Sequence, residues 1–150
     1  MPRKHQPPAF LAAMVSADTY ERWLEGKARA HVRRDKGRGR NAVRSIYKEL
    51  IHSAVRASGG RDTYTGDKLD WSLIGKWDND SSSRDKHKYK AKFSLLPTVD
   101  HVVASEHGTP FVICSWQTND AKNDLSLADF LLLCRKVLKH AQRKKMKRGG

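Results

Sequence analysis

The stretch "TVDHVVASEHGTPFVICSWQTNDAKN", from Thr98 to Asn123, decides the fold of this chain. Its β-branched and aromatic residues predict two strands, about Thr98–Ala104 and Phe111–Trp116, joined by "SEHGTP". Thr118 is a fair N-cap and predicts a short helical turn after the second strand. An Asp-His pair lies in the first strand, where a packed core favours neither residue type. The pair therefore predicts a functional site.

Helical periodicity predicts three further elements. Apolar residues at helical spacing indicate helices over about Asp18–His31, capped by Asp18 or Ser16, and over Asn41–Ser58, which Gly59-Gly60 ends. "RRDKGRGRN" between them predicts a loop, which is either a solvated linker or an arm that contacts phosphates. Ser126 caps a last amphipathic helix whose predicted inward face is formed by Leu127, Phe130, Leu131, Cys134, Val137 and Leu138.

These elements predict an α+β chain with a ββα unit at its centre, N-terminal helices and a C-terminal amphipathic helix. Residues 1–17 are expected to be a basic flexible N-terminus and residues 141–150 a basic disordered tail. A single domain is expected over 18–140, made of a helical extension (18–60) and a core (61–140).

The charge indicates a polyanionic partner. The 150 residues carry a formal net charge of +14, with 38% hydrophobic and 31% charged residues. Self-repulsion on this scale favours binding to nucleic acid, ribosomal RNA included, or to an anionic membrane surface. No apolar run approaches the ~18 residues that span a bilayer, so we expect no membrane segment. Cys114 and Cys134 lie in apolar patterns, which predicts reduced core thiols and a cytoplasmic protein.

The residues around the Asp-His pair suit phosphodiester hydrolysis with one metal ion. Asp100 and Asn119 offer hard oxygen ligands for Mg²⁺ or Mn²⁺. His101 can take a proton from the attacking water near neutral pH. Asn123 would share a helix face with Asn119 as a further ligand, and Lys122 would contact a phosphate. Because neighbouring strand residues point to opposite faces, the strand must twist, bulge or end at the pair.

This order of residues resembles the HNH, or ββα-metal, endonuclease family. The resemblance covers residues 61–139 and is carried by Asp100-His101, "FVICSW" and "TNDAK", with "DTYTG" (62–66) similar to the family's knuckle turn. It implies that His101 is the general base, that Asp100 and Asn119 bind the metal, and that Lys122 supports the site.

Two departures from the family pattern carry further expectations. The positions of the family's zinc-binding knuckles hold Asp62, Thr65, Ser115 and Thr118, so we expect no structural zinc. Apolar packing around Trp71, Phe93 and Trp116 would then have to replace the metal. The family's middle polar residue falls near Pro110, where Thr109, His107 or a backbone carbonyl could orient His101 instead.

The predicted function is that of a metal-dependent endonuclease acting on double-stranded DNA, although the sequence does not distinguish DNA from RNA as the substrate. Whether it nicks or cuts both strands depends on whether it forms a homodimer, which the sequence leaves open. The alternatives are a catalytically inactive nucleic-acid-binding protein, associated with RNA or the ribosome, and an interaction module for an acidic protein. The residues predicted to contact nucleic acid are Lys122, Arg33, Arg34, Arg38, Arg40, Lys88, Lys90, Arg143, Lys144 and Lys145.

Overall fold

The structure, a computed structural model, describes residues 4–76 and 91–149. The chain divides into two units, Met1–Asn119 and Asp120–Gly150. The described residues form helices and a two-stranded antiparallel sheet, which confirms the predicted mixture of helix and antiparallel strand. None of the helices in these ranges is both long and apolar enough to cross a bilayer.

The sheet is a hairpin of β1 (Pro97–His101) and β2 (Phe111–Ser115). Its register pairs Val99 with Ile113 and His101 with Phe111, so these four side chains share one face. Both strands are shorter than predicted. After His101 the chain leaves the sheet, although the sequence predicts a strand to Ala104, and a single turn of helix, α5 (Ala104–His107), forms at the start of the predicted loop.

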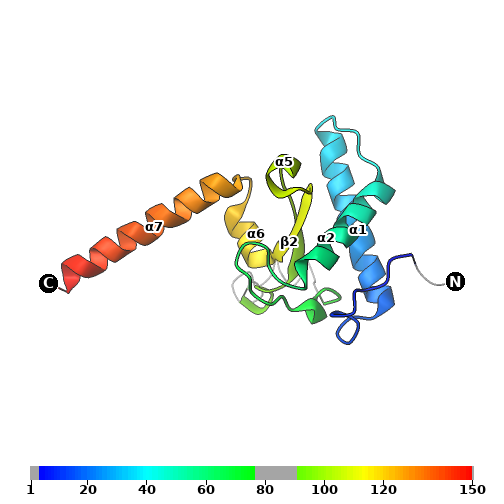
Figure 1. Cartoon of the computed structure of the whole chain (residues 1–150), viewed down its shortest axis with the longest axis horizontal. Coiled ribbons are helices and arrows are strands. Elements are labelled where there is room, and N and C mark those ends of the chain that lie inside the picture. Colours follow the sequence, from blue (N-terminus) through cyan, green and yellow to red (C-terminus); the bar gives the residue numbers. More distant parts are fainter. Residues whose placement is uncertain (1–3, 77–90, 150) are drawn as a thin grey trace. The chain divides into compact units, whose positions relative to one another are not determined.

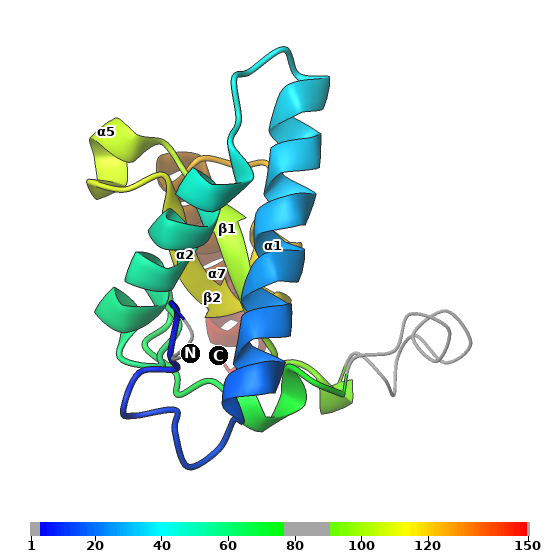
Figure 2. The ribbon, with the colours of Figure 1, turned by 90° about the vertical axis from the view of Figure 1, so that its right-hand side faces the viewer.

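Two helices, α1 (Ala17–Gly37) and α2 (Arg44–Ser58), lie along the same side of the hairpin (Figures 1 and 2). The core of the first unit forms between them because each presents an apolar stripe to the hairpin. Its buried residues include Tyr20, Trp23, Leu24 and Ala28 of α1, Ile51, Ala54 and Val55 of α2, and Val99, Phe111 and Ile113 of the strands.

Helix α1 begins where the sequence predicts and continues beyond its predicted end. Ser16 caps it by accepting a hydrogen bond from the backbone N–H of Thr19 at 3.1 Å. The helix then runs through Arg33 and Arg34 to Gly37, so the first half of the predicted Arg/Gly loop is helical. The prediction failed because it followed the glycines and charges and did not extend the buried stripe past His31 to Asp35.

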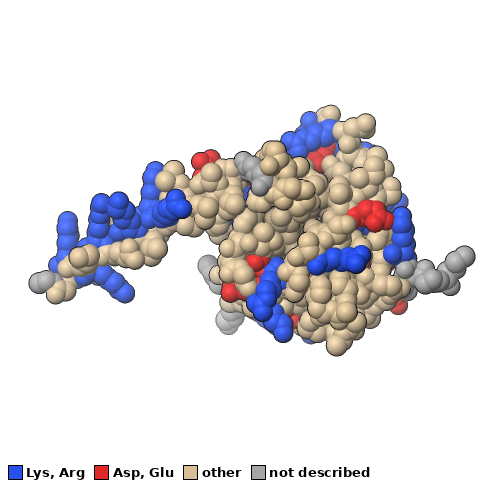
Figure 3. Space-filling view, viewed as in Figure 1, with Lys and Arg blue, Asp and Glu red and all other residues tan. Residues whose placement is uncertain are grey.

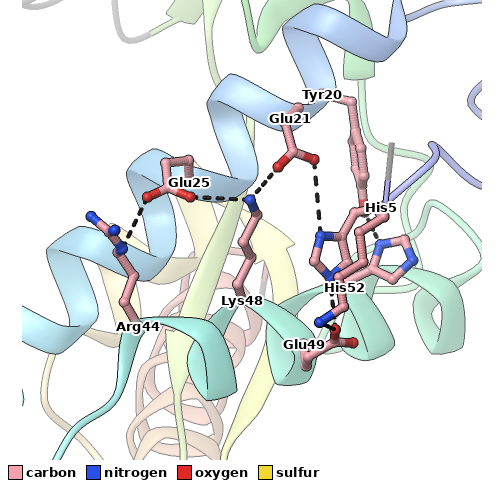
Figure 4. A network of polar contacts seen from close by, with 9 residues as sticks. His5, Tyr20, Glu21, Glu25, Arg44, Lys48, Glu49 and His52 are labelled. Carbon is pink, nitrogen blue, oxygen red and sulfur yellow. Dashed lines mark hydrogen bonds and ion pairs between the residues drawn. The ribbon is translucent and has the colours of Figure 1, made fainter. Parts of the chain in front are cut away.

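The N-terminal segment packs on the helices, although the sequence predicts a flexible terminus. Leu11 and Val15 belong to the core, and His5 is 4% exposed. His5 Nε2 lies 3.0 Å from Glu49 Oε1, and Lys4 pairs with the same oxygen at 2.9 Å. Figure 4 shows the wider network, in which Lys48 joins Glu21 to Glu25, Arg44 pairs with Glu25, and Tyr20 bonds to His52.

Residues 61–76 form the predicted turn and a short 3-10 helix. Arg61 and Lys68 form an isolated bridge across the turn, and Gly66 adopts a φ of 77° at its bend. The 3-10 helix η1 (Trp71–Leu73) follows, capped by Asp70. Trp71 is buried in the main core, whereas Phe93 forms a second cluster with Leu73 and Leu96, against which Trp116 packs.

The second unit contains α7 (Leu127–Arg148), which Ser126 caps by accepting from the N–H of Asp129 at 3.1 Å. No residue of α7 is buried: in the predicted inward-facing stripe Leu131, Cys134, Val137 and Leu138 are exposed, and Leu127 and Phe130 are half-buried. Cys134 is exposed and Cys114 buried, so only Cys114 is a core thiol. The helix also continues through the predicted disordered tail to Arg148.

Candidate functional site

The predicted Asp-His pair lies at the end of β1. His101 is the last residue of the strand, opposite Phe111, and Asp100 precedes it, opposite Val112. Their side chains point to opposite faces of the hairpin, His101 toward the helices and Asp100 away from them. The strand ends at the pair, as one of the three expected arrangements requires, but the two side chains still lie on opposite faces.

Asp100 is held by a tyrosine from the knuckle turn. Its carboxylate is 7% exposed, and Oδ2 accepts a hydrogen bond of 2.6 Å from the hydroxyl of Tyr64. Burial, followed by the bond to Asp100, raises the pKa of Tyr64 well above its usual value. The tyrosine is therefore a neutral donor at neutral pH, and it fixes the direction of the Asp100 carboxylate.

His101 lies in an aromatic pocket with one acidic neighbour. Its ring stacks on Phe111 at 5.0 Å between centroids, and its side chain is 18% exposed. His31 of α1 lies edge-on to it at 6.1 Å. Burial, with Arg34 and His101 nearby, lowers the pKa of His31 to about 4, so His31 is neutral at neutral pH.

The acidic neighbour is Asp35 of α1, a residue that the sequence places in a loop. Its carboxylate is fully buried, with Oδ1 3.5 Å from Nδ1 of His101 and 3.8 Å from Arg40 Nη1. The hydroxyl of Tyr47 donates to Oδ2 at 2.5 Å. Asp35 continues the buried stripe of Tyr20, Leu24, Ala28 and His31 at helical spacing, and this continuation is the signal that could have identified it.

The four knuckle positions meet through hydrogen bonds. Asp62 is 2% exposed, and its Oδ2 accepts from the backbone N–H of Ser115 at 3.0 Å and from the hydroxyl of Thr118 at 2.8 Å. Its Oδ1 accepts from the N–H groups of Tyr64 and Thr65. The Ser115 and Thr118 hydroxyls bond to each other at 2.9 Å. We call Asp62, Thr65, Ser115 and Thr118 the knuckle network.

The knuckle network adds hydrogen bonds to the apolar packing of Trp71, Phe93 and Trp116 that the sequence predicts. Thr118 lies inside α6 (Trp116–Lys122) and not at its N-cap, so its hydroxyl is available to Asp62. Burial opposes ionisation of Asp62, but hydrogen bonds from the Ser115 and Tyr64 backbone and from the two hydroxyls lower its pKa. A buried, charged carboxylate thus joins the turn to β2 and α6.

Helix α6 carries the remaining predicted ligands. Asn119 lies in the helix and is half-buried, and Lys122 ends the helix at 5% exposed. Asn123 is exposed and has a φ of 51°, a left-handed conformation that asparagine adopts readily after a helix. The predicted shared face of Asn119 and Asn123 is therefore wrong, and the burial of Lys122 does not favour a phosphate contact.

The residues near Pro110 do not replace the family's middle residue as expected. The Thr109 hydroxyl bonds to the backbone of Phe111, and the Pro110 carbonyl accepts from Val102 N–H at 2.8 Å. His107 is half-buried at the end of α5. Among the described residues, the group that faces a ring nitrogen of His101 is Asp35.

The predicted nucleic-acid contacts lie on two elements. Arg33, Arg34, Arg38 and Arg40 are exposed at and beyond the C-terminal end of α1. Arg143, Lys144 and Lys145 are exposed on α7, where Lys and Arg side chains gather toward the C-terminus (Figure 3). Lys88 and Lys90 lie outside the described residues.

Within residues 4–76 and 91–149, no three His, Cys, Asp or Glu side chains are close enough to hold a metal ion. Comparison of the chain with protein-family models, curated proteins and solved structures finds no match. Function has therefore to be inferred from the residues and their geometry.

Proposed function

We propose that this protein is a metal-dependent DNA endonuclease and that its hairpin and α6 form a zinc-free ββα-metal unit of the HNH type. His101 would act as general base, and Asp100 and Asn119 would hold the metal ion.

The observation that carries the proposal is the position of Asp100 and His101 at the end of β1. The two side chains leave opposite faces of the hairpin at the point where the backbone turns away. A phosphodiester lying across the strand end could then be met from one side by the carboxylate and from the other by the imidazole. The His101 side chain is 18% exposed, so its ring is partly open to solvent.

The knuckle network supports the ββα-metal assignment. Asp62 bonds to Ser115 and Thr118, which lie more than fifty residues further along the chain. These are the positions at which the resemblance expects metal-binding cysteines, and a carboxylate with hydroxyl and amide donors makes the same cross-connection there. The hydrogen bonds to Asp62 involve a charged acceptor, which makes each of them stronger than a neutral pair.

The donor set suits a magnesium ion. Asp100 offers a carboxylate and Asn119 an amide oxygen, and Mg²⁺ needs only one or two such protein ligands because it keeps several waters and binds the substrate phosphate. When bound, the metal would stabilise negative charge on the phosphate and on the leaving oxygen. Asn123 is not needed for this set.

The charge of the chain favours DNA as the substrate. A formal net charge of +14 supplies affinity for any polyanion, and the exposed arginines after α1 and the cations of α7 are where contacts to phosphates are expected. Base-reading contacts are not needed for such binding, so we expect cleavage with little sequence preference.

A plasmid assay tests the proposal. The wild-type protein and the variants His101→Ala and Asp100→Ala are incubated with supercoiled plasmid in Mg²⁺, in Mn²⁺ and in EDTA. We expect nicking or linearisation by the wild type that requires the metal, and its loss in both variants. His107→Ala, which changes a histidine of α5 with no assigned role, is the matched control and should cleave normally.

The rival function predicts a different result. A catalytically inactive nucleic-acid-binding protein would retard the plasmid in a gel without cutting it in either metal. That outcome, or equal cleavage by the wild type and His101→Ala, would overturn the endonuclease proposal.

A further inference from the structure

We infer that Asp35 is a positioning residue for His101: its carboxylate accepts the proton on Nδ1 and so leaves Nε2 as the basic nitrogen. The inference rests on the proposed function, because it specifies the tautomer of His101, the general base of that reaction. It adds to the site a residue of α1, an element outside residues 61–139, which the family resemblance covers.

The carboxylate of Asp35 lies in a buried environment with few donors. Asp35 is fully buried, and among the described residues none donates a hydrogen bond to its Oδ1. The cationic or potential donor groups facing this oxygen are His101 Nδ1 at 3.5 Å and Arg40 Nη1 at 3.8 Å. A buried carboxylate oxygen without a donor is costly, so a small closure onto an Nδ1–H is favourable.

The other carboxylate oxygen of Asp35, Oδ2, already accepts a hydrogen bond. Tyr47 donates to Oδ2 at 2.5 Å. Burial, then the hydrogen bond and charge of Asp35, raise the pKa of Tyr47 to about 12, so its hydroxyl keeps its proton. Tyr47 therefore fixes the carboxylate with Oδ1 directed toward His101.

Aromatic contacts on two sides hold the imidazole ring of His101 in place. His101 stacks on Phe111, its cross-strand partner, and His31 packs edge-on against it. A ring held in this way keeps one nitrogen toward Asp35 and the other away from it. The pair then has the form in which an acid orients a catalytic histidine and stabilises the imidazolium that appears during reaction.

The tautomer of the wild-type protein is the first test, and it needs no substitution. Long-range ¹H–¹⁵N correlation on the ¹⁵N-histidine-labelled full chain distinguishes the two nitrogens, with His101 assigned by the loss of its signals in His101→Gln. The spectrum is recorded at about pH 8, above the ordinary pKa of histidine. We expect a proton on Nδ1 of His101, and a proton on Nε2 would overturn the inference.

The second test compares Asp35→Leu with Tyr20→Phe, a substitution elsewhere on α1. Leucine removes the charge and both acceptor oxygens; because it is larger than aspartate and the site is buried, the fold of the variant is first checked by circular dichroism. We expect Asp35→Leu to shift His101 toward the Nε2-protonated tautomer and to lower kcat for plasmid cleavage about 10²- to 10⁴-fold with KM unchanged. Tyr20→Phe removes a buried tyrosine hydroxyl of the same helix, which bonds to His52 about four turns from Asp35, and should keep both the tautomer and, within a few-fold, kcat.

The outcomes separate this inference from the proposed function. If the wild type cleaves DNA, His101→Ala does not, and Asp35→Leu cleaves like the wild type, Asp35 has no positioning role and the endonuclease proposal stands. If the wild type does not cleave, the endonuclease proposal fails and the positioning role fails with it.

Discussion

Asp62 joins three parts of the chain through its two carboxylate oxygens. One oxygen accepts from backbone groups of its own turn, and the other accepts from Ser115 and Thr118. Small domains often use a metal ion for such a connection, because their cores supply little stability. In this chain, hydrogen bonds to the buried carboxylate of Asp62 connect the turn to β2 and α6.

Replacing Asp62 by Ala should therefore destabilise the protein. Three backbone N–H groups and one hydroxyl lose a charged acceptor in a buried site, which should lower the free energy of unfolding by about 3 kcal/mol. Urea denaturation measures the change. Asp67→Ala, an exposed aspartate of the same turn, is the control and should cost under about 0.5 kcal/mol. Equal effects of the two substitutions would contradict this role of Asp62.

His31 should make stability depend on pH. Burial lowers its pKa from 6.5 to about 4, so the folded state binds fewer protons than the unfolded state between these values. Its contribution is complete above about pH 6.5 and is lost as the pH falls toward 4, which amounts to about 2 kcal/mol between pH 7 and pH 5. Urea denaturation at both pH values should show this loss, and His31→Gln should show less of it. An unchanged pH dependence in the variant would exclude His31 as its source.

Sequence patterns indicate a candidate site residue when its signal is local, and they miss one whose burial depends on a tertiary contact. Asp100 and His101 were identifiable because polar residues in a strand pattern are conspicuous. Asp35 was not, since a charged residue among arginines and glycines indicates solvent. Its burial depends on the tertiary contact between α1 and α2, which places Tyr47 beside it. The helical spacing of the buried stripe places Asp35 on the covered face, but the contact with Tyr47 leaves no local pattern.

At the level of elements, the sequence predicts the type of the long helices and of the strands and several helix ends, but neither the strand ends nor α5. The caps at Ser16 and Ser126 and the glycine after α2 are local signals, and the structure has each of them. Strand ends depend on the partner strand: β1 ends at His101, where its pairing with β2 ends, although Val102 and Val103 favour a strand.

The sequence predicts that the apolar stripe of α7 is buried in a core. Within the described part of the second unit, no other segment covers this stripe. Amphipathic spacing shows which residues of a helix share a face, and it does not show what covers that face. Leu131 is 43% exposed and Leu138 is 58% exposed. These leucines should therefore contribute little to the stability of the folded chain.

Substitutions of leucine in the exposed helix α7 and in the buried face of α1 should differ strongly in their effect on the free energy of unfolding. Leu131→Gln and Leu138→Gln should each change the free energy of unfolding by under about 0.5 kcal/mol, because both side chains are already exposed to water. Leu24→Ala, in α1, removes a fully buried side chain and should cost about 2–5 kcal/mol. Urea denaturation compares the three variants, and a large loss from either glutamine would show that α7 is covered in the folded protein.

Across the whole molecule, charge is the property on which the proposed binding to DNA depends. The basic residues that we expect to contact phosphates lie at the end of α1 and on α7. Each phosphate that a cation neutralises releases counterions, so affinity must fall steeply as salt rises.

The salt dependence of binding tests the contribution of α7. Replacing Arg143, Lys144 and Lys145 together by Ala should reduce the slope of log affinity against log salt by about 2–3 for duplex DNA. Replacing Arg22, Arg29 and Lys68, which are also exposed and are not among the predicted contacts, removes the same charge and should change the slope by less than about 1. Fluorescence anisotropy at several salt concentrations gives both slopes. Equal slopes for the two triple variants would show that net charge, and not α7, sets the affinity.

The most direct test of the central claim is the single-turnover rate of cleavage of a duplex DNA in Mg²⁺ by the wild type and by His101→Ala. Loss of a general base should lower the rate about 10²- to 10⁴-fold, while the affinity for the duplex stays the same. Cleavage by the wild type with this loss in the variant is the predicted result. A wild type that binds the duplex without cutting it, or a variant that cuts as fast, would contradict the assignment of a nuclease site to Asp100 and His101.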